Sequence, residues 1–384
     1  MARLLHALKA MVLLIGNYPP DRQQSMQRFA LMMLDGLTAA GVPAELIQPQ
    51  PFFGRFQFAG RFVAKWLAYV DKFILFPRRL RSRLKTTPAL VHICDHSNAM
   101  YARHIRNLPV IATCHDLLAV RGALGEETDC PASATGKLLQ RWIISGLEKA
   151  TVVSCVSRAT LADARRLVTS REGKPRFEMI SLGLNYPYRV LPPHEARARL
   201  AEHSILGPEQ PFVLHVGVNL HRKNREGVLR IFALCKDQWT GSLVFAGEPL
   251  SPALRSLARQ LGVLERVVEA PNATSELLEA LYNCATALLF PSTFEGFGWP
   301  IAEAQACGCP VLCTDREPMT EVAGGAALTH DLEDEAGFAA DLLRLTNPVE
   351  REHWRTKGLE NVQRFTSALM IARYCELYRS LAPV

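Results

Sequence analysis

Residues 290–311 read FPSTFEGFGWPIAEAQACGCPV, and this stretch combines a strand end, a loop and a helix start. An apolar run ends at Pro291, and a loop containing Glu295 and two glycines follows it. Pro300 is typical of the first turn of a helix, and Gly308 is typical of its end. The stretch therefore predicts a strand, a loop and a helix in series, which is the repeating element of a parallel α/β sheet.

The same alternation of apolar runs and amphipathic stretches extends over both halves of the sequence. In the first half we predict strands at 11–15, 43–47, 90–94, 109–113, 151–155 and 178–181, and helices at 27–40, 61–85, 137–149 and 158–168. In the second half we predict strands at 212–217, 242–247, 266–269, 287–291 and 310–314, and helices at 225–236, 252–261, 275–284, 300–307 and 367–381. The pattern predicts an α/β protein with two doubly wound, Rossmann-like domains.

A proline-rich segment at residues 186–193, YPYRVLPP, is the best candidate for a link between these domains. We therefore place an N-terminal domain at 1–188 and a second domain at 189–366, with a C-terminal helix at 367–384 that can pack back on the first. The chain of 384 residues is long enough for two hydrophobic cores. In such sheets ligands bind at the carboxyl ends of the strands, so we expect the site in the cleft between the domains.

The composition indicates a globular protein, with 48% hydrophobic and 21% charged residues and no apolar run long enough to span a membrane. Its ten cysteines show no regular spacing, which is typical of reduced thiols in the cytoplasm. The net charge of +7 is concentrated, because residues 51–90 contain nine Lys or Arg and one acid. The basicity is therefore a local patch. No nucleic-acid-binding module is recognisable, and we expect no nucleic-acid partner.

Glu295 and Glu303 lie on either side of the predicted helix start. Gly296 and Gly298 let the backbone approach a ligand closely, and the free N–H groups of a helix start suit a diphosphate. Two carboxylates in these positions can bind hydroxyl groups at opposite ends of a sugar diphosphate. The alternative is that the two acids only stabilise the helix dipole.

This stretch resembles the retaining glycosyltransferases of the GT-B fold, specifically family four, also called glycosyl transferases group 1. Glu295 and Glu303, with seven residues between them, match the E-x7-E motif of that family, and the surrounding residues agree with it. The resemblance implies two facing Rossmann-like domains with an interdomain cleft. It also implies that the N-terminal domain binds the acceptor and that the C-terminal domain binds the nucleotide sugar.

The resemblance assigns Glu303 to the ribose of the nucleotide and Glu295 to hydroxyl groups of the donor sugar. It further implies that backbone groups of the loop and the helix start hold the sugar and the diphosphate, at Gly296, Phe297, Gly298 and Ile301.

Lys223 matches the phosphate-binding lysine of the family. A cation in this position stabilises the negative charge that develops on the leaving diphosphate. Family members often have an arginine directly after the strand glycine, where this chain has Val218, so we expect Arg222 to assist Lys223. The alternative is that both cations are solvated loop residues.

His115 follows a predicted strand of the first half, in the sequence Thr113-Cys114-His115-Asp116. Family members have a histidine at this place that contacts the donor sugar, so His115 joins Lys223 and Glu295 as a candidate catalytic residue. Asp116 is expected to orient it or to cap the next segment. The alternative is a structural histidine whose hydrogen bonds are satisfied. Asp95 and His96 have a similar position with weaker support, and we leave them out of the catalytic set.

These features predict a retaining glycosyltransferase that moves mannose or another hexose from a nucleoside-diphosphate sugar to a glycan or lipid-linked acceptor, as in bacterial polysaccharide or glycoconjugate assembly. No cofactor and no metal are expected, because Lys223 and helix amides take the place of a metal and no Asp-x-Asp motif occurs. The alternatives are a non-catalytic nucleotide-sugar-binding protein and an epimerase or phosphorylase of the same fold.

Residues 51–85 also suggest contact with an anionic membrane surface, at the inner face of the membrane. Aromatic residues recur there at helix-compatible spacing beside the cations, at Phe62, Trp66, Tyr69, Phe73 and Phe76. The alternative is a long helix whose aromatic residues belong to the core and whose cations face water.

Overall fold

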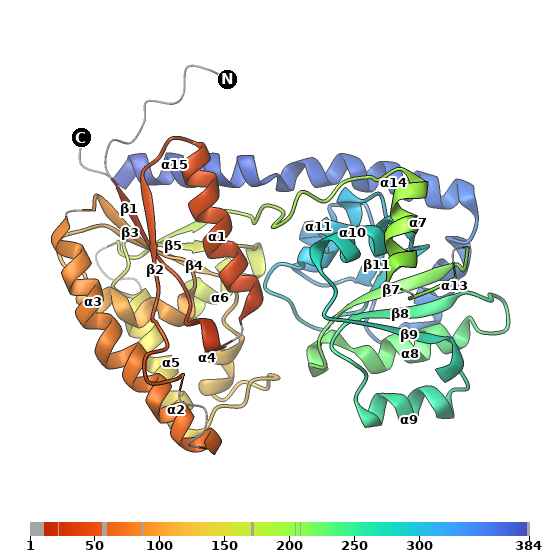
Figure 1. The fold of residues 1–384 in the computed structure, drawn as a ribbon, viewed down its shortest axis with the longest axis horizontal. Helices are drawn as coiled ribbons and strands as arrows, with labels where there is room; N and C mark the ends of the chain where they lie inside the picture. Colours follow the sequence, from red (N-terminus) through yellow and green to blue (C-terminus); the bar gives the residue numbers. More distant parts are fainter. Residues whose placement is uncertain are drawn as a thin grey trace. The chain divides into compact units, whose positions relative to one another are not determined.

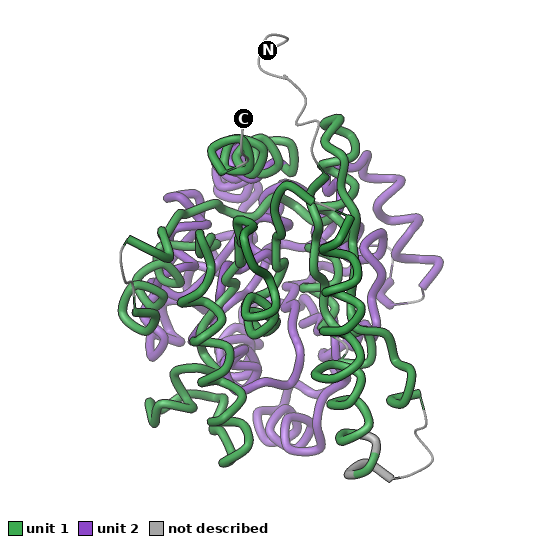
Figure 2. Tube along the Cα trace, turned by 90° about the vertical axis from the view of Figure 1, so that its left-hand side faces the viewer, with its two compact units in different colours: residues 1–185, 367–384 green, residues 186–366 purple. Residues whose placement is uncertain are grey.

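The computed structural model of this chain describes residues 11–21, 23–55, 60–86, 88–169, 173–203, 205–207 and 209–381. The chain forms two compact units (Figure 2). Unit 1 consists of residues 1–185 and 367–384, and unit 2 consists of residues 186–366. Each unit contains one parallel sheet of six strands, which confirms the predicted α/β class with two doubly wound domains (Figure 1).

The sheet of unit 1 has the strand order β2-β1-β3-β4-β5-β6. Its strands are β1 (Val12–Ile15), β2 (Ala44–Ile47), β3 (Leu90–Ile93), β4 (Val110–Cys114), β5 (Val152–Cys155) and β6 (Arg176–Met179). The chain leaves β1 toward β2 on one side and later enters β3 on the other side. The order therefore reverses between β1 and β3, and such a topological switch point is where ligands bind in this class of sheet.

Most helices of unit 1 lie between its strands in chain order, and α15 is added from the C-terminal end of the described chain. They are α1 (Gln24–Ala39), α2 (Gly60–Val70), α3 (Phe76–Arg83), α4 (Leu118–Ala123), α5 (Ala134–Leu147), α6 (Arg158–Leu167) and α15 (Ser367–Leu381), with a 3-10 helix at His96–His104. The residues of β1 are fully buried, because parallel sheets with helices on both faces need apolar side chains on both sides of the strand.

The predicted single helix at 61–85 is interrupted. Between α2 and α3 the chain forms a π-helical stretch, Asp71–Leu75, and the Asp71 side chain is 1% exposed. Its carboxylate accepts hydrogen bonds from the hydroxyl of Tyr18 at 2.9 Å and from the amide of Gly54 at 2.8 Å. The break therefore occurs where a buried acid anchors the segment to distant parts of unit 1.

Helix α15 packs beside α1 in unit 1, although the two are far apart in the sequence (Figure 1). A Cβ atom on Gly36 would lie 2.5 Å from Cγ1 of Ile371, so only glycine permits this close approach. Farther along α15, the hydroxyl of Tyr378 lies 2.6 Å from Nδ1 of His92 on β3. The C-terminal helix is thus part of the core of unit 1.

The sheet of unit 2 has the strand order β12-β11-β10-β7-β8-β9. Its strands are β7 (Phe212–Gly217), β8 (Ser242–Gly247), β9 (Val267–Pro271), β10 (Ala287–Phe290), β11 (Val311–Thr314) and β12 (Leu328–His330). Its helices are α7 (Pro193–Glu202), α8 (Arg225–Leu234), α9 (Pro252–Gln260), α10 (Ser275–Cys284), α11 (Trp299–Ala306), α12 (Met319–Ala323), α13 (Glu335–Arg344) and α14 (Pro348–Asn361). The strand order reverses between β7 and β10, which places the switch point of unit 2 there.

Across the described ranges, no helix combines the length and the apolar character that a membrane span requires.

Candidate functional site

The loops at the switch point of unit 2 bring Lys223 and Glu295 together. Lys223 ends a short 3-10 helix, His221–Lys223, that follows β7, and Glu295 lies in the loop between β10 and α11. Nζ of Lys223 donates a hydrogen bond to Oε1 of Glu295 at 2.6 Å. The two predicted residues are thus direct partners across the switch point.

Lys223 is buried, with 8% of its surface exposed. Its aliphatic stem passes over Gly217, where an added Cβ would lie 3.3 Å from both Cγ and Cδ of the lysine. Its ammonium lies 4.9 Å from the centre of the Phe290 ring, which is a favourable cation–π distance. The alternative of a solvated loop lysine is therefore wrong, because the side chain is enclosed and directed.

Arg222 binds the second oxygen of the Glu295 carboxylate. Its Nη1 donates to Oε2 of Glu295 at 2.8 Å. Burial alone would raise the pKa of Glu295, but Lys223 and Arg222 outweigh it and hold that pKa below its ordinary value of 4.5. Burial lowers the pKa of Lys223, and Glu295 offsets part of this effect. The group contains two cations and one carboxylate, so it keeps one net positive charge for an anionic ligand.

Glu303 lies in the middle of α11 and is 5% exposed. Its Oε2 accepts a hydrogen bond from the hydroxyl of Tyr282 at 2.9 Å. Neither Glu295 nor Glu303 is in the first turn of α11, which contains no acidic residue. The alternative that both acids only stabilise the helix dipole does not fit these positions.

The loop before α11 and the first turn of that helix combine a glycine of unusual backbone conformation with side chains that are buried in the core. Gly298 has a φ of 100°, which favours glycine, and it precedes the helix directly. Phe297 is 5% exposed and packs against Phe365 with 5.4 Å between the ring centres. Ile301 is fully buried, and its amide donates to the carbonyl of Gly298 at 3.0 Å. The side chains of Phe297 and Ile301 therefore belong to the core, and the amide of Ile301 already has an acceptor.

His115 lies in unit 1, directly after β4, and is 5% exposed. Its Nε2 lies 3.0 Å from the carbonyl of Cys94, so this nitrogen donates and Nδ1 is the unprotonated one. The ring of Phe29 packs edge-on at 4.8 Å. Burial lowers the pKa of His115, which keeps the imidazole neutral.

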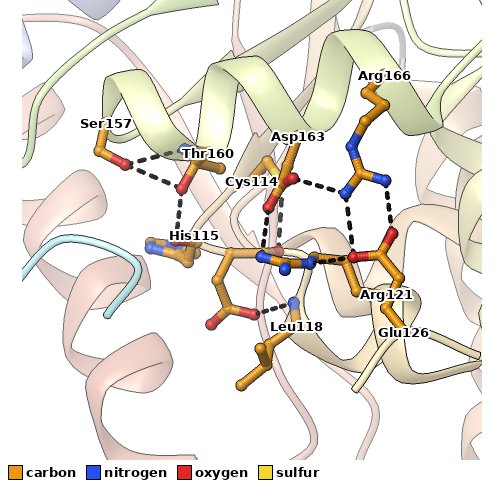
Figure 3. A network of polar contacts seen from close by, with 10 residues as sticks. Cys114, His115, Leu118, Arg121, Glu126, Ser157, Thr160, Asp163 and Arg166 are labelled. Atoms are coloured by element: carbon orange, nitrogen blue, oxygen red, sulfur yellow. Dashed lines mark hydrogen bonds and ion pairs between the residues drawn. The ribbon is translucent and has the colours of Figure 1, made fainter. Parts of the chain in front are cut away.

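A polar network fixes the backbone around His115 (Figure 3). The hydroxyl of Thr160 on α6 donates to the His115 carbonyl at 3.3 Å. Asp116 accepts from the amide of Leu118 at 3.1 Å, so it caps the segment that begins α4. Two arginines and two acids then tie α4 to α6, and these are Arg121, Glu126, Asp163 and Arg166.

Two buried residues that contact acidic side chains were not among the predicted site residues. The first is Tyr282, whose partner Glu303 is 21 residues away in the sequence. The second is Asn17, which donates to Asp95 at 2.6 Å across the switch point of unit 1. A sequence signal existed only for the second contact, because Asn17 and Asp95 each follow a predicted strand.

Within the described parts of the chain, no three His, Cys, Asp or Glu side chains gather in a way that could hold a metal ion.

The comparison with known families covers both units. The profile described as Glycosyl transferases group 1 matches residues 198–356, and the profile described as Glycosyltransferase Family 4 matches residues 26–177. The chain belongs to the glycosyl transferases group 1 family. The stretch that contains Glu295 and Glu303 lies within the first of these matches.

Two curated relatives are each 30% identical to this group 1 chain. One is O-antigen chain mannosyltransferase B of Escherichia coli, aligned over 41% of this chain and 42% of the relative. The other is D-inositol 3-phosphate glycosyltransferase of Nocardia farcinica, aligned over 66% of this chain and 57% of the relative. The alignments thus span about half the length of these relatives.

Solved structures show the fold. Anabaena HepE, determined in complex with UDP and glucose, superposes with a TM-score of 0.71 at 16% sequence identity. The superposition covers 97% of this chain and 100% of the HepE chain. This similarity, together with the two parallel six-stranded sheets, confirms the GT-B fold class predicted for the group 1 family.

Proposed function

We propose that this protein transfers a hexose from a nucleoside-diphosphate sugar to a glycan or lipid-linked acceptor, with retention of configuration. The observation that carries the proposal is the group of the buried Lys223 and Glu295 with the partly exposed Arg222 at the switch point of unit 2. The two cations follow β7, and Glu295 lies in the loop between β10 and α11, so a diphosphate at the start of α11 would meet both the cations and free backbone amides.

The charges of this group suit bond breaking at a sugar diphosphate. As the bond between sugar and diphosphate breaks, negative charge grows on the leaving oxygen, and a cation held in place stabilises it without reorganisation. Glu295 holds Lys223 and Arg222 in one geometry, and its carboxylate can also accept hydrogen bonds from sugar hydroxyl groups. The acceptor hydroxyl then approaches the same face of the sugar, and an oxygen of the leaving diphosphate takes its proton.

Support for the sugar and the acceptor comes from the names of related proteins. A mannosyltransferase among the relatives and a glucose complex among the solved structures both favour a hexose. The relatives named for O-antigen chains and for D-inositol 3-phosphate favour a glycan or a polyol phosphate as acceptor, and the lipid-linked acceptor rests on the sequence prediction alone. The assignment of His115 to the donor sugar rests on the family resemblance and stays a prediction.

The test is release of nucleoside diphosphate from a panel of UDP-, GDP- and ADP-hexoses, with and without membrane extracts that contain acceptor. Transfer that depends on the extract supports the proposal, and the anomeric configuration of the product, measured by NMR, decides retention. Conversion of the nucleotide sugar into an isomer would identify an epimerase. Binding without turnover would identify a nucleotide-sugar-binding protein.

We also propose that unit 1 contacts an anionic membrane surface, through a patch that differs from the predicted one. Phe76 is a core residue, and Phe73 packs against the same core, while the side chain of Phe62 lies outside the described residues. Trp66 on α2 is 51% exposed, and Trp142 on α5 is 37% exposed.

An aromatic series joins these two tryptophans across the surface of unit 1. The ring centres are 5.6 Å apart for Trp66 and Tyr69, 5.4 Å for Tyr69 and Phe73, and 6.0 Å for Phe73 and Trp142. Exposed cations accompany them on the same helices, at Lys65, Lys137 and Arg141. Tryptophans beside cations are the residues that anchor proteins at an anionic bilayer interface.

A further inference from the structure

Unit 2 contains a cavity of about 550 Å³ at the end of its sheet that is opposite to Lys223 and Glu295. Three lining residues show this position, because Phe212 begins β7, Thr286 directly precedes β10 and Pro310 directly precedes β11. Lys223 and Glu295 instead follow the carboxyl ends of β7 and β10. The six residues of β7 extend over about 17 Å, so the cavity is separate from the candidate donor site.

Four helices of unit 2 surround this cavity. Helix α7 packs on α10, and α11 packs on α14 (Figure 1). The lining includes Cys284, the last residue of α10, and Cys307 and Gly308, which directly follow α11. The cavity therefore lies where two helices end, and its volume is within the range of pockets that bind small organic molecules.

The inner wall of the cavity is apolar. Its buried apolar lining residues are Leu191, Leu200, Phe212 and Ala285. Such a wall suits the apolar body of an organic ligand, because the transfer of apolar surface out of water is favourable.

Three arginines form a more exposed part of the lining, and two of them already have a carboxylate partner. Nη1 of Arg197 donates to Glu209 at 2.9 Å. Nη1 of Arg355 donates to Glu352 at 2.9 Å. The third is Arg351, whose side chain has no hydrogen bond or ion pair with any described residue. These five residues are the charged residues of the lining, so one positive charge is left over.

Two observations place Arg351 and Arg355 against the end of α11. Burial raises the pKa of the Cys309 thiol to about 12, and the backbone of Leu288 and the charge of Arg351 oppose that effect. The guanidinium of Arg351 is therefore within electrostatic reach of this buried thiol. Arg355 crosses the end of the helix, where a Cβ atom on Gly308 would lie 2.8 Å from its Nε. The surplus positive charge thus lies beside the cavity.

We infer that this cavity binds a small organic monoanion, with a carboxylate paired to Arg351 and an apolar body against the inner wall. A guanidinium binds a carboxylate through two parallel hydrogen bonds, and the one surplus charge matches one carboxylate. A phosphate monoester would bring nearly two negative charges to the same place. The ligand is distinct from the sugar donor and from the acceptor, and its site does not depend on the proposed function.

The experiment uses the full chain with naphthalene-2-carboxylate as the probe and naphthalene-2-carboxamide as its neutral counterpart. Titrations followed by saturation-transfer difference NMR measure the dissociation constant of each compound. The carboxylate should bind about tenfold more tightly than the carboxamide, because only the carboxylate forms a charge-assisted pair. Arg351→Gln should remove this difference and leave Tm unchanged, since the residue is exposed. Arg259→Gln, at an exposed arginine on α9, is the matched control.

A second variant fills the cavity. Ala201 is an exposed lining residue on α7, so Ala201→Trp should abolish binding of both compounds without disturbing the core. Ala253→Trp, at an exposed alanine on α9 outside the lining, should bind both compounds as the wild type does. Thermal unfolding of each variant shows that the fold is kept.

Lys223→Met distinguishes the cavity from the candidate donor site. This variant should bind the carboxylate as the wild type does, and a loss of binding would place the compound beside Lys223 and overturn the inference. Equal affinity of the wild type for the carboxylate and the carboxamide would contradict the pairing with Arg351. Absence of carboxylate binding by the wild type, or undiminished binding by Ala201→Trp, would overturn the inference as well.

Discussion

The ammonium of Lys223 lies 2.6 Å from Oε1 of Glu295, and both residues are buried. Before any donor binds, the cation is thus held by a carboxylate from another loop. Arg222 on the second oxygen makes the carboxylate a bridge between two cations. Substitutions in this group are therefore expected to affect activity and stability together.

Lys223→Met should reduce transfer strongly. Methionine keeps most of the apolar stem that crosses Gly217 and removes only the charge. Losing one preorganised cation costs roughly 3 kcal/mol of transition-state stabilisation, or about a hundredfold in rate. Lys236→Met, at an exposed lysine of unit 2, is the control for steady-state turnover. Near-wild-type turnover in Lys223→Met would show that Arg222 or another cation holds the diphosphate.

The same substitution should also destabilise unit 2. It leaves the buried Glu295 with one cation instead of two, and an incompletely paired buried charge costs about 1–3 kcal/mol. Adding Glu295→Gln removes the buried carboxylate charge. The double variant should therefore lose less free energy of unfolding than the two single variants lose together. Urea unfolding of the four proteins measures this coupling. Additive losses would mean that the pair contributes nothing to the folded state.

Glu295 and Glu303 should differ in their effect on nucleotide binding. Glu303 is assigned to the ribose, so Glu303→Ala should weaken binding of nucleoside diphosphate by about 1.5–3 kcal/mol, as expected for a charge-assisted hydrogen bond. Glu295 is assigned to the sugar, so Glu295→Ala should abolish transfer while nucleoside diphosphate binds nearly as in the wild type. Calorimetry and turnover of both variants provide the comparison. The reverse pattern would show that the two assignments are exchanged.

Acid should destabilise unit 1 through His92. Burial, and after it the nearby His115, lowers the pKa of His92 from 6.5 to about 3. Between these values only the unfolded state binds the proton, so stability is present above about pH 6.5 and falls as the pH decreases. One such proton contributes a slope of about 1.4 kcal/mol per pH unit. His92→Gln should therefore unfold more easily at pH 7.5 but show a flatter loss toward pH 4.5. Urea unfolding at both pH values measures the free energy of unfolding of each protein. If wild type and His92→Gln lose the same free energy of unfolding between pH 7.5 and pH 4.5, His92 is excluded as the source.

Trp66→Ala together with Trp142→Ala should abolish binding to anionic vesicles. Both residues are exposed in unit 1, so the fold should tolerate the change. Flotation with phosphatidylglycerol vesicles at low salt measures binding, and raising the salt should release the wild type. Val349→Ala, at a residue of unit 2 that is 77% exposed, is the control. Wild-type protein that stays with the unbound fraction at low salt would contradict the membrane proposal.

The strands were largely predictable because burial on both faces of a parallel sheet leaves continuous apolar runs. The exceptions are two edge strands, β6 and β12. Strand β6 has a mixed composition and lies at Arg176–Met179 and not at 178–181, and the short β12, Leu328–His330, was not predicted. The break at Asp71 depends on Tyr18 and Gly54, which no local pattern reveals. Helices α4, α7, α12, α13 and α14 were not predicted at all.

The candidate site was predictable where it is a local motif and not where it depends on distant contacts. The spacing of Glu295 and Glu303 can be seen in one short stretch of sequence. The burial of Lys223 cannot be predicted in this way, because the residues that enclose it come from other segments of the fold. The pairing of Asn17 with Asp95 joins residues 78 positions apart, so only the strand order brings them together.

Because unit 1 is assembled from residues 11–185 and from α15, the order of synthesis on the ribosome matters for folding. Unit 2 is continuous and can fold as soon as it emerges. The core of unit 1 is complete only after residues 367–381 have been made, and until then His92 and the surface of α1 near Gly36 lack their partners on α15. During that interval the nascent chain exposes the apolar surface that chaperones recognise, so the amount of folded protein should depend on them.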